Sequence, residues 1–374
     1  MSSLAGSPRR YLLAAVAIGG LLSALGLLLA LPLNGRSAAR PQLEAVFAAF
    51  DAQHPGRGAD MGHAEIQDEA MAYALYASAA LIADRPGEAR TAARWLIENH
   101  GAPGRTGWGL PFAWDAFSDG SVNPPSTVYG ITTALAVRAL LDTYEATGDK
   151  THAKVAEAAL TDYATSATRS PNGLYFWYSD QPSDATEVPN VVSMLMGQYA
   201  RAANLLHRDD FAQLAGAAFG ELMAQRQLDG GLATWPYSVA KPAGRNDLVH
   251  ASYVVQGLID YGRWRHLQLD LAAELSYLRG YIHVGCITNM PEAPAPGTCA
   301  KPATLWGLGM LLYTLADAGD TRNAELVAAR LEAYRFAPGR YGQHLGDHVF
   351  APRAQAHLLF GLTRLARLEV RPAD

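Results

Sequence analysis

The chain has 374 residues, with 30 Lys and Arg against 35 Asp and Glu, which gives a formal net charge of −5. It carries no basic stripe and no zinc-binding or RNA-binding signature, so its composition argues against a nucleic-acid partner. The length is ample for one large hydrophobic core.

The first forty residues differ from the rest. An almost unbroken apolar run covers residues 11–33, and a bilayer core needs about 20 such residues. Arg9 and Arg10 precede it, so the positive-inside rule keeps residues 1–10 cytoplasmic and exports the remainder of the chain. We predict a single-pass inner-membrane anchor at 11–33, a linker at 34–41 and a periplasmic domain at 42–370. A cleaved signal peptide is the alternative, although its apolar region is usually shorter.

Twelve helices are predicted in the exported part, and the connections between them alternate in length. A long loop follows each odd-numbered helix and a short turn each even-numbered one. The even-numbered helices are apolar nearly all round, so protein must surround them, whereas the odd-numbered ones are amphipathic. An inner and an outer ring of six helices are therefore expected. The predicted helices span 42–53, 62–83, 87–100, 126–147, 150–168, 189–207, 209–227, 247–264, 267–282, 301–318, 321–335 and 352–369.

The short turns repeat along the chain at a period of roughly 50–60 residues, which indicates a helical-hairpin repeat. Gly148-Asp149 and Gly319-Asp320 each follow an inner helix. In such a pair, Gly ends one helix and Asp caps the next. Six hairpins predict an all-α (α/α)6 toroid, with an open solenoid as the alternative. All long loops then share one end, where the N-termini of the inner helices suit anionic or oxygen-rich ligands.

The long loops combine aromatic and polar side chains, a combination that suits carbohydrates. Aromatic faces stack on sugar C–H surfaces, and a binding cleft needs an apolar lining with a few convergent polar groups. The alternative is that the aromatic residues only pack the loops onto the toroid. The side chains predicted to bind a polysaccharide are Trp108, Trp114, Asn123, Tyr129, Tyr175, Trp177, Tyr178, Asn190, Trp235, Tyr237, Asn246, His344 and His348.

Glycoside hydrolysis is the first chemistry considered for this end. It needs a protonated carboxyl group and a second carboxylate across the scissile bond. The candidate acids are Asp115 and Asp119, and the candidate partners are Glu187 and Asp247. An acid of this kind needs a desolvated carboxyl with a raised pKa. Each Asp could instead be a turn residue or a helix cap.

The rival chemistry is abstraction of the proton next to a uronate carboxylate, as in lyases and epimerases. It needs a group that neutralises the carboxylate and a base of matched pKa. Asn246, His250 and Tyr253 are spaced to share one helix face, and Asn190 is a candidate neutraliser. The alternative is a core histidine beside a packed tyrosine.

Nothing in the sequence predicts a cofactor. His344, Asp347 and His348 match no specific zinc signature. The sequence also has no Gly-rich phosphate loop, no Gly-x-Ser-x-Gly elbow and no Asp-x-Asp-Asp run of the kind a terpene-cyclase-like toroid would carry. Cys286 and Cys299 flank a Pro-rich loop, and they form a disulfide in an oxidising compartment or stay as two buried thiols.

At the level of architecture, residues 42–370 resemble the six-hairpin carbohydrate-active toroids, through the stretches 107–112, 123–134 and 175–179. These toroids include glycoside hydrolases, polysaccharide lyases and the C-terminal domain of glucuronyl C5-epimerases. The cluster of Asn246, His250 and Tyr253 is similar to the Asn/His/Tyr sites of toroid lyases, although the only arginine beside it in sequence is Arg245.

The resemblance implies an enzyme that processes an exported bacterial polysaccharide. We expect a glycoside hydrolase. A uronate lyase or C5-epimerase is the first alternative, and a non-catalytic glycan-binding subunit is the second. Besides the membrane, the expected partner is exopolysaccharide export machinery.

Overall fold

The computed structural model describes residues 35–370, apart from 61, 102–103 and 292–298. The apolar run at 11–33 lies outside these residues. Within the described part, no helix is long and apolar enough to cross a membrane. Within the segment predicted as a linker at 34–41, residues 35–41 belong instead to the first described helix, which begins at Gly35.

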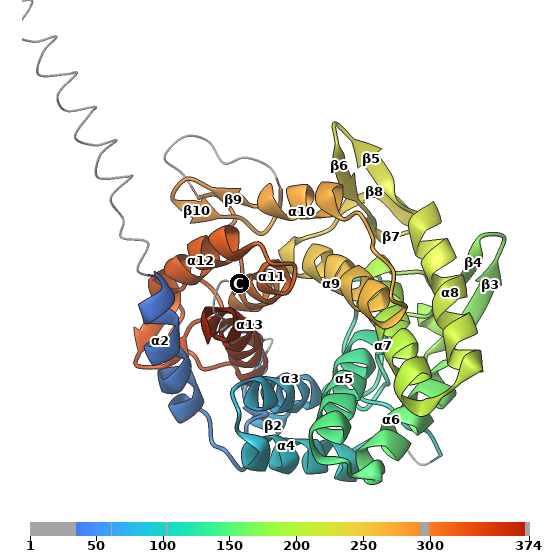
Figure 1. Ribbon diagram of the computed structural model, residues 1–374, viewed down its shortest axis with the longest axis horizontal. Coiled ribbons are helices and arrows are strands. Elements are labelled where there is room, and N and C mark those ends of the chain that lie inside the picture. Colours follow the sequence, from blue (N-terminus) through green and yellow to red (C-terminus); the bar gives the residue numbers. More distant parts are fainter. Residues whose placement is uncertain (1–34, 61, 102–103, 292–298, 371–374) are drawn as a thin grey trace, which may run out of the picture.

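Twelve α-helices of the described chain alternate between two concentric rings (Figure 1). The outer ring consists of α2 (Gly35–Ala49), α4 (Pro86–Glu98), α6 (Lys150–Tyr163), α8 (Asp209–Ala224), α10 (Ala272–Arg279) and α12 (Thr321–Arg330). The inner ring consists of α3 (Ala70–Ile82), α5 (Gly130–Thr147), α7 (Pro189–Leu206), α9 (Leu248–Trp264), α11 (Leu305–Asp317) and α13 (Pro352–Val370). The predicted alternation of inner and outer helices is confirmed.

The inner ring is closed. Consecutive inner helices pack against each other, and α13 packs against α3, which joins the two ends of the repeat (Figure 1). Residues are buried on every side of α5 and α7, whereas α4 buries only a stripe of small and apolar residues. This difference follows from the all-round apolar sequences of the inner helices. The fold is the predicted (α/α)6 toroid, and the open solenoid is excluded.

Glycines bring neighbouring inner helices into close contact. A Cβ on Gly309 of α11 would collide with the backbone of His357 on α13, and one on Gly361 would lie 2.5 Å from the carbonyl oxygen of Gly309. Gly257 of α9 meets the backbone of Ser193 on α7 in the same way. Any side chain at these positions would push two helices apart in a closed ring.

The short turns follow the predicted pattern in part. Gly148 adopts a left-handed conformation with φ 72°, and the Asp149 side chain accepts the backbone N–H of Thr151 at 2.9 Å. Gly319 is also left-handed, with φ 79°. However, the Asp320 side chain makes no cap bond; it pairs with Arg279 at 2.7 Å, so its predicted cap role is wrong.

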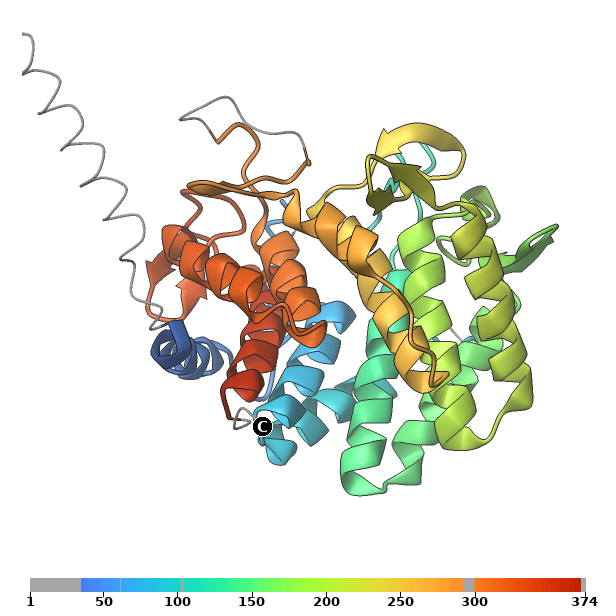
Figure 2. The same ribbon diagram turned by 45° about the horizontal axis from the view of Figure 1, so that its top comes forward.

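Short antiparallel hairpins occupy most of the long connections. Figure 2 shows the connections before α9 and α11, coloured yellow and orange, rising from one end of the helix ring. The pairs are β1 (Arg57–Gly58) with β2 (Gln67–Asp68), β3 (Ala167–Ser170) with β4 (Gly173–Phe176), β5 (Gln227–Asp229) with β6 (Leu232–Thr234), β7 (Pro236–Ser238) with β8 (Lys241–Arg245), β9 (Ile282–His283) with β10 (Cys286–Ile287), and β11 (Arg335–Ala337) with β12 (Arg340–Tyr341).

Several predicted helices are shorter than expected at the loop end. The helix predicted at 62–83 begins at Ala70, because the chain before it forms the hairpin β1–β2. The helix predicted at 301–318 begins at Leu305, where the Thr304 hydroxyl caps the N–H of Gly307. The connections are therefore longer than predicted. Cys286 and Cys299 form a disulfide across one of them, with a Cα–Cα distance of 5.8 Å.

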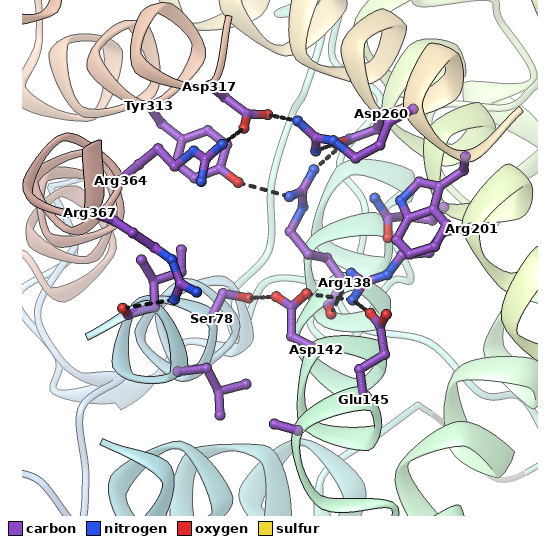
Figure 3. A pocket seen from close by; sticks show the side chains of 16 residues that line it. Ser78, Arg138, Asp142, Glu145, Arg201, Asp260, Tyr313, Asp317, Arg364 and Arg367 are labelled. Atoms are coloured by element: carbon purple, nitrogen blue, oxygen red, sulfur yellow. Dashed lines mark hydrogen bonds and ion pairs between the residues drawn. The ribbon is translucent and has the colours of Figure 1, made fainter. Parts of the chain in front are cut away.

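The other end of the ring carries a belt of ion pairs around a cavity of about 510 Å³ (Figure 3). Arg138 of α5 reaches across the ring, pairs with Asp260 of α9 and donates to the Tyr313 hydroxyl of α11 at 3.1 Å. Arg263 joins Asp260 at 3.2 Å to Asp317 of α11 at 2.8 Å. These polar contacts link three inner helices.

The belt continues through the remaining inner helices. Arg364 of α13 pairs with Asp317 at 2.5 Å. On the opposite side, Arg201 of α7 pairs with Asp142 of α5 at 2.6 Å, and Ser78 of α3 donates to the same carboxylate at 2.6 Å (Figure 3). All six inner helices therefore contribute polar groups to this end.

Candidate active site

A cavity of about 120 Å³ lies where the inner helices begin, at the loop end; we call it the axial cavity. The loops contribute mainly aromatic walls to it. Every inner helix supplies at least one lining residue, so the site depends on closure of the ring. Those residues are Met71 (α3), Ile131 and Thr132 (α5), Asn190 (α7), Val249, His250 and Tyr253 (α9), Trp306 (α11) and Arg353 (α13).

Two larger cavities adjoin the axial cavity. The first flanking cavity, of about 590 Å³, shares Tyr237 and His250 with it and also contains Asp247. The second flanking cavity, of about 690 Å³, shares Trp306 and Arg353 with it. Together the three cavities have room for more than one sugar unit.

Asp247 orients His250 in the wall of the axial cavity. The Asp247 carboxylate caps α9 by accepting the backbone N–H of His250 at 3.1 Å, and it lies 2.6 Å from Nδ1 of the ring. Burial alone would raise the pKa of Asp247, but the charge and hydrogen bonds of His250 outweigh it and hold that pKa below its usual range. An ionised carboxylate on Nδ1 keeps the proton there and leaves Nε2 free to act as a base.

Tyr253 is held by a histidine that sequence reasoning missed. Its hydroxyl lies 2.5 Å from Nε2 of His357, whose Nδ1 lies 2.8 Å from the carbonyl oxygen of Arg353. Burial lowers the pKa of His357 to about 3, so the imidazole is neutral and accepts from the tyrosine. Burial also raises the pKa of Tyr253. Tyr253 is therefore a protonated phenol at neutral pH, and its O–H donates to His357.

Asn190 and Arg353 bring amide and guanidinium groups to the same cavity. Asn190 is 2% exposed, and its Oδ1 has no hydrogen-bond partner among the described residues. The Arg353 side chain is 5% exposed, its Nε lies 2.8 Å from Asp60, and its guanidinium covers the Trp306 ring at 4.3 Å. Arg353 is the arginine that the sequence cluster lacked, and it comes from the last inner helix.

The predicted acids Asp115 and Asp119 hold a turn. The Asp115 carboxylate accepts the backbone N–H groups of Asp119 at 3.2 Å and Gly120 at 2.9 Å. Asp119 is exposed, and the side-chain hydrogen bond from Ser121 lowers its pKa. The expectation that Asp119 is a desolvated acid is wrong, because its pKa shifts the opposite way. Asp119 lines the first flanking cavity, and neither residue lines the axial one.

Glu187 retains a proton but lies away from the cavities. It is 6% exposed, and burial, followed by the charge of Glu221, raises its pKa to about 8. It is not a lining residue of the axial cavity or of either flanking cavity. Glu187, predicted as the partner acid, is therefore a buried packing residue and does not lie beside a substrate in these cavities.

The aromatic residues divide into two groups. Trp114, Tyr129, Tyr178 and Tyr237 line the axial cavity, as predicted for substrate contact. The others are packing residues, because the toroid surrounds their rings or satisfies their polar atoms. Trp108 and Trp235 are buried and donate to backbone carbonyls, Trp177 donates to Thr168 at 2.9 Å, and Tyr175 packs against the core.

Of the remaining residues predicted to bind substrate, some line a cavity and others are buried or packed elsewhere. Asn123 is buried and donates to Asp184 at 2.6 Å, and Asn246 is buried and donates to the Trp235 carbonyl at 3.1 Å. Asn246 therefore does not join His250 and Tyr253 in the cavity wall. His344 lines the second flanking cavity, whereas His348 stacks on Phe336. Among the described residues, no group of three His, Cys, Asp or Glu is placed to hold a metal ion.

No protein-family model and no curated protein matches the sequence. Solved structures do match the fold. A GH76 alpha-mannanase of Bacteroides thetaiotaomicron superposes with a TM-score of 0.61 at 12% identity, over 88% of this chain and 96% of that one. A sugar epimerase from a ruminal bacterium gives 0.59 at 13%, over 88% and 98%. A polysaccharide lyase gives 0.59 at 15%, over 91% and 99%. The chain thus has the six-hairpin toroid fold of these carbohydrate-active proteins, as the resemblance implied.

Proposed function

We propose that this protein abstracts the proton next to the carboxylate of a uronate residue in an acidic polysaccharide, as a lyase or an epimerase. The observation that carries this proposal is the lining of the axial cavity. It unites His250, Tyr253, Asn190 and Arg353, whereas the candidate carboxylates Asp119 and Asp247 line the first flanking cavity and not the axial one. The hydrolysis favoured by the sequence would need two such carboxylates across the bond.

Binding of the substrate carboxylate is assigned to Arg353 and Asn190. A buried guanidinium attracts the carboxylate and stabilises the charge that develops when the adjacent C–H bond breaks. The amide of Asn190 offers both a donor and an acceptor, and its oxygen has no partner among the described residues. Lowering the cost of the enolate-like state is what makes a weakly acidic C5–H accessible to a histidine.

Proton transfer is assigned to His250 and Tyr253. Nε2 of His250 takes the C5 proton, and the Asp247 carboxylate stabilises the imidazolium that results. In a lyase, the electron pair forms the C4–C5 double bond, the C4–O bond breaks, and Tyr253 gives its proton to the departing oxygen. In an epimerase, Tyr253 returns a proton to C5 from the opposite face. Both reactions use the same four residues and differ only in the product.

A polymeric substrate fits the surroundings of this site. The flanking cavities extend the axial cavity on two sides through shared walls. The proteins named as a polysaccharide lyase and a sugar epimerase have the same fold at 15% and 13% identity, so the architecture accommodates this class of reaction, as it also accommodates a mannanase.

We also propose a location for the enzyme. Residues 11–33 would anchor it in the inner membrane, with the toroid in the periplasm and exopolysaccharide export machinery as its partner. The disulfide between Cys286 and Cys299 supports an oxidising compartment. Protease digestion of intact spheroplasts would test this, because an external domain is degraded and a cytoplasmic one is protected.

The reaction is tested by incubating the protein with a panel of uronate polymers. A lyase raises ultraviolet absorbance through the unsaturated uronate, and an epimerase incorporates solvent deuterium at C5. Tyr253→Phe should lower either rate by about 100-fold or more, the range for a lost general acid. Tyr261→Phe makes the same change on the same helix outside the cavity and should keep the rate. New reducing ends without unsaturation would favour hydrolysis, and binding without any product would favour a glycan-binding subunit.

A further inference from the structure

Two buried carboxyl groups accompany Arg353 beside the axial cavity, and neither lines that cavity. The Asp60 carboxylate lies 2.8 Å from Nε of Arg353, and the two side chains are 1% and 5% exposed. Glu69, the residue before α3, is 2% exposed and hydrogen-bonds the Asp60 side chain. The sequence alone indicates none of these three residues, and the reaction described above uses only Arg353.

The backbone holds this cluster rigidly. The loop that carries Asp60 presses against α3 and α13, because a Cβ on Gly56 would collide with the Tyr73 ring and one on Gly58 would lie 2.7 Å from Cδ of Pro352. The N–H of Glu69 also donates to the carbonyl of Gly56 at 2.9 Å. The backbone that leads to Asp60 and Glu69 is therefore closely packed against α3 and α13.

The protonation state of the second carboxyl group, Glu69, sets the net charge of the cluster. If both carboxyl groups were ionised, the cluster with Arg353 would carry a net charge of −1 and would repel a uronate. If one proton remains on the pair, the cluster is neutral, and the guanidinium can attract a substrate carboxylate. We propose that a proton held by Glu69, next to the ion pair of Asp60 and Arg353, keeps Arg353 competent to bind a carboxylate, and that loss of this proton releases the acidic sugar.

The surroundings of Glu69 agree with a retained proton. Burial is the main cause that raises its pKa, to about 8, and the neighbouring Asp60 adds to the rise while Arg353 opposes it. The other titratable groups that share the wall with Asp60 are His63, His344 and Asp347. A separate ion pair, Arg57 with Asp68, lies on the hairpin β1–β2.

The affinity for a carboxylated sugar should therefore depend on pH in one direction. As the pH rises past the pKa of Glu69, a second negative charge appears beside Arg353, so affinity for a carboxylated sugar falls. Asp60 and Glu69 act through Arg353 and are positioning residues. The inference rests on the proposed function only in taking a uronate as the ligand.

The test uses glucuronate as the probe and calorimetry as the readout, so it needs no turnover. For the wild type, the dissociation constant should rise about 5-fold or more between pH 6 and pH 9, the scale of a typical coupling between sites. Glu69→Gln is isosteric and cannot ionise, so it should lose the part of this pH dependence that Glu69 causes; any dependence that remains comes from the other titratable groups that line the cavities. The methyl ester of glucuronate is the matched ligand without a charge, and its binding should not change with pH in either protein.

Three results would overturn the inference. One is a Glu69→Gln variant that keeps the wild-type pH dependence, another is a wild type that fails to bind glucuronate at pH 6, and the third is a carbon-13 NMR titration that places Glu69 in the ordinary carboxyl range. These outcomes are separate from the fate of the proposed reaction. A protein that binds glucuronate as described but leaves every uronate polymer unchanged would refute the lyase or epimerase activity, while the inference about the Glu69 proton would stand.

Discussion

Arg138 is the residue on which closure of the ring can be tested most sharply. It lies on α5 and crosses the ring to Asp260 on α9 and Tyr313 on α11, so one side chain bridges three inner helices. The Arg138 and Asp260 side chains are 7% and 3% exposed. Arg138→Met keeps most of the length and apolar volume of the side chain while it removes the charge.

The expected loss of folding stability in Arg138→Met depends on the contacts that Asp260 retains. Breaking a buried ion pair by removing one partner costs about 3–5 kcal/mol, mainly because the other charge is left buried. Asp260 keeps Arg263 at 3.2 Å, so the lower end, about 3 kcal/mol, applies. Arg364→Met is the matched control. Its side chain is 25% exposed and Asp317 keeps Arg263, so a loss of about 1 kcal/mol is expected.

Urea unfolding followed by tryptophan fluorescence and circular dichroism would measure both variants. A double variant, Arg138→Met with Asp260→Asn, should recover part of the stability, because it removes the stranded charge. If Arg138→Met lost less than about 1 kcal/mol, the charge pair would behave as a solvated surface pair. The reasoning that the belt holds the helix ring together at this end would then be wrong.

Three further perturbations test separate parts of the structure. Gly309→Ala should lower the free energy of unfolding by about 1–3 kcal/mol through overpacking against α13; a neutral effect would mean that the two helices separate freely. Glu187 has its pKa raised to about 8, so the folded state keeps a proton that the unfolded state releases, and stability should fall by up to about 1.4 kcal/mol per pH unit between about pH 4.5 and 8. In urea unfolding at pH 5 and pH 8, Glu187→Gln should remove this contribution and leave the similar one from Glu69; an unchanged slope would show that Glu187 makes no contribution. Replacing Cys286 and Cys299 by Ser should cost about 3 kcal/mol, since the bond closes a loop with a sequence separation of 13; equal stability of the variant and the wild type would show that the bond does not form in the cell.

The ring could be predicted from the sequence because its signals are local and repeated. An all-round apolar sequence, as in α5 and α7, directly predicts a buried helix. A Gly-Asp pair such as Gly148-Asp149 directly predicts a turn between two helices. The start of α3 lies later than the sequence predicts, for a physical reason. The hairpin β1–β2 depends on how Gly56 and Gly58 pack against Tyr73 and Pro352, and these contacts have no periodic signature.

The site was only partly predictable. His250 and Tyr253 could be paired because both lie on α9, whereas Arg353 and His357 join them only when α13 closes the ring. Its place in the first turn of an inner helix, which Asn190 and His250 share, would have been the signal for Arg353. Composition could not separate Trp114 in the cavity from a buried tryptophan such as Trp108, because the path of the loop decides which way each ring points.

The most direct test of the proposed chemistry is a kinetic isotope effect at C5 of the uronate. A substrate polymer carrying deuterium at C5 would be compared with the ordinary polymer, for the wild type and for His250→Ala. Proton abstraction by His250 predicts that deuteration slows the wild type several-fold and that His250→Ala is nearly inactive. Turnover at equal rates with both polymers, accompanied by new reducing ends, would contradict it, because hydrolysis leaves the C5–H bond intact.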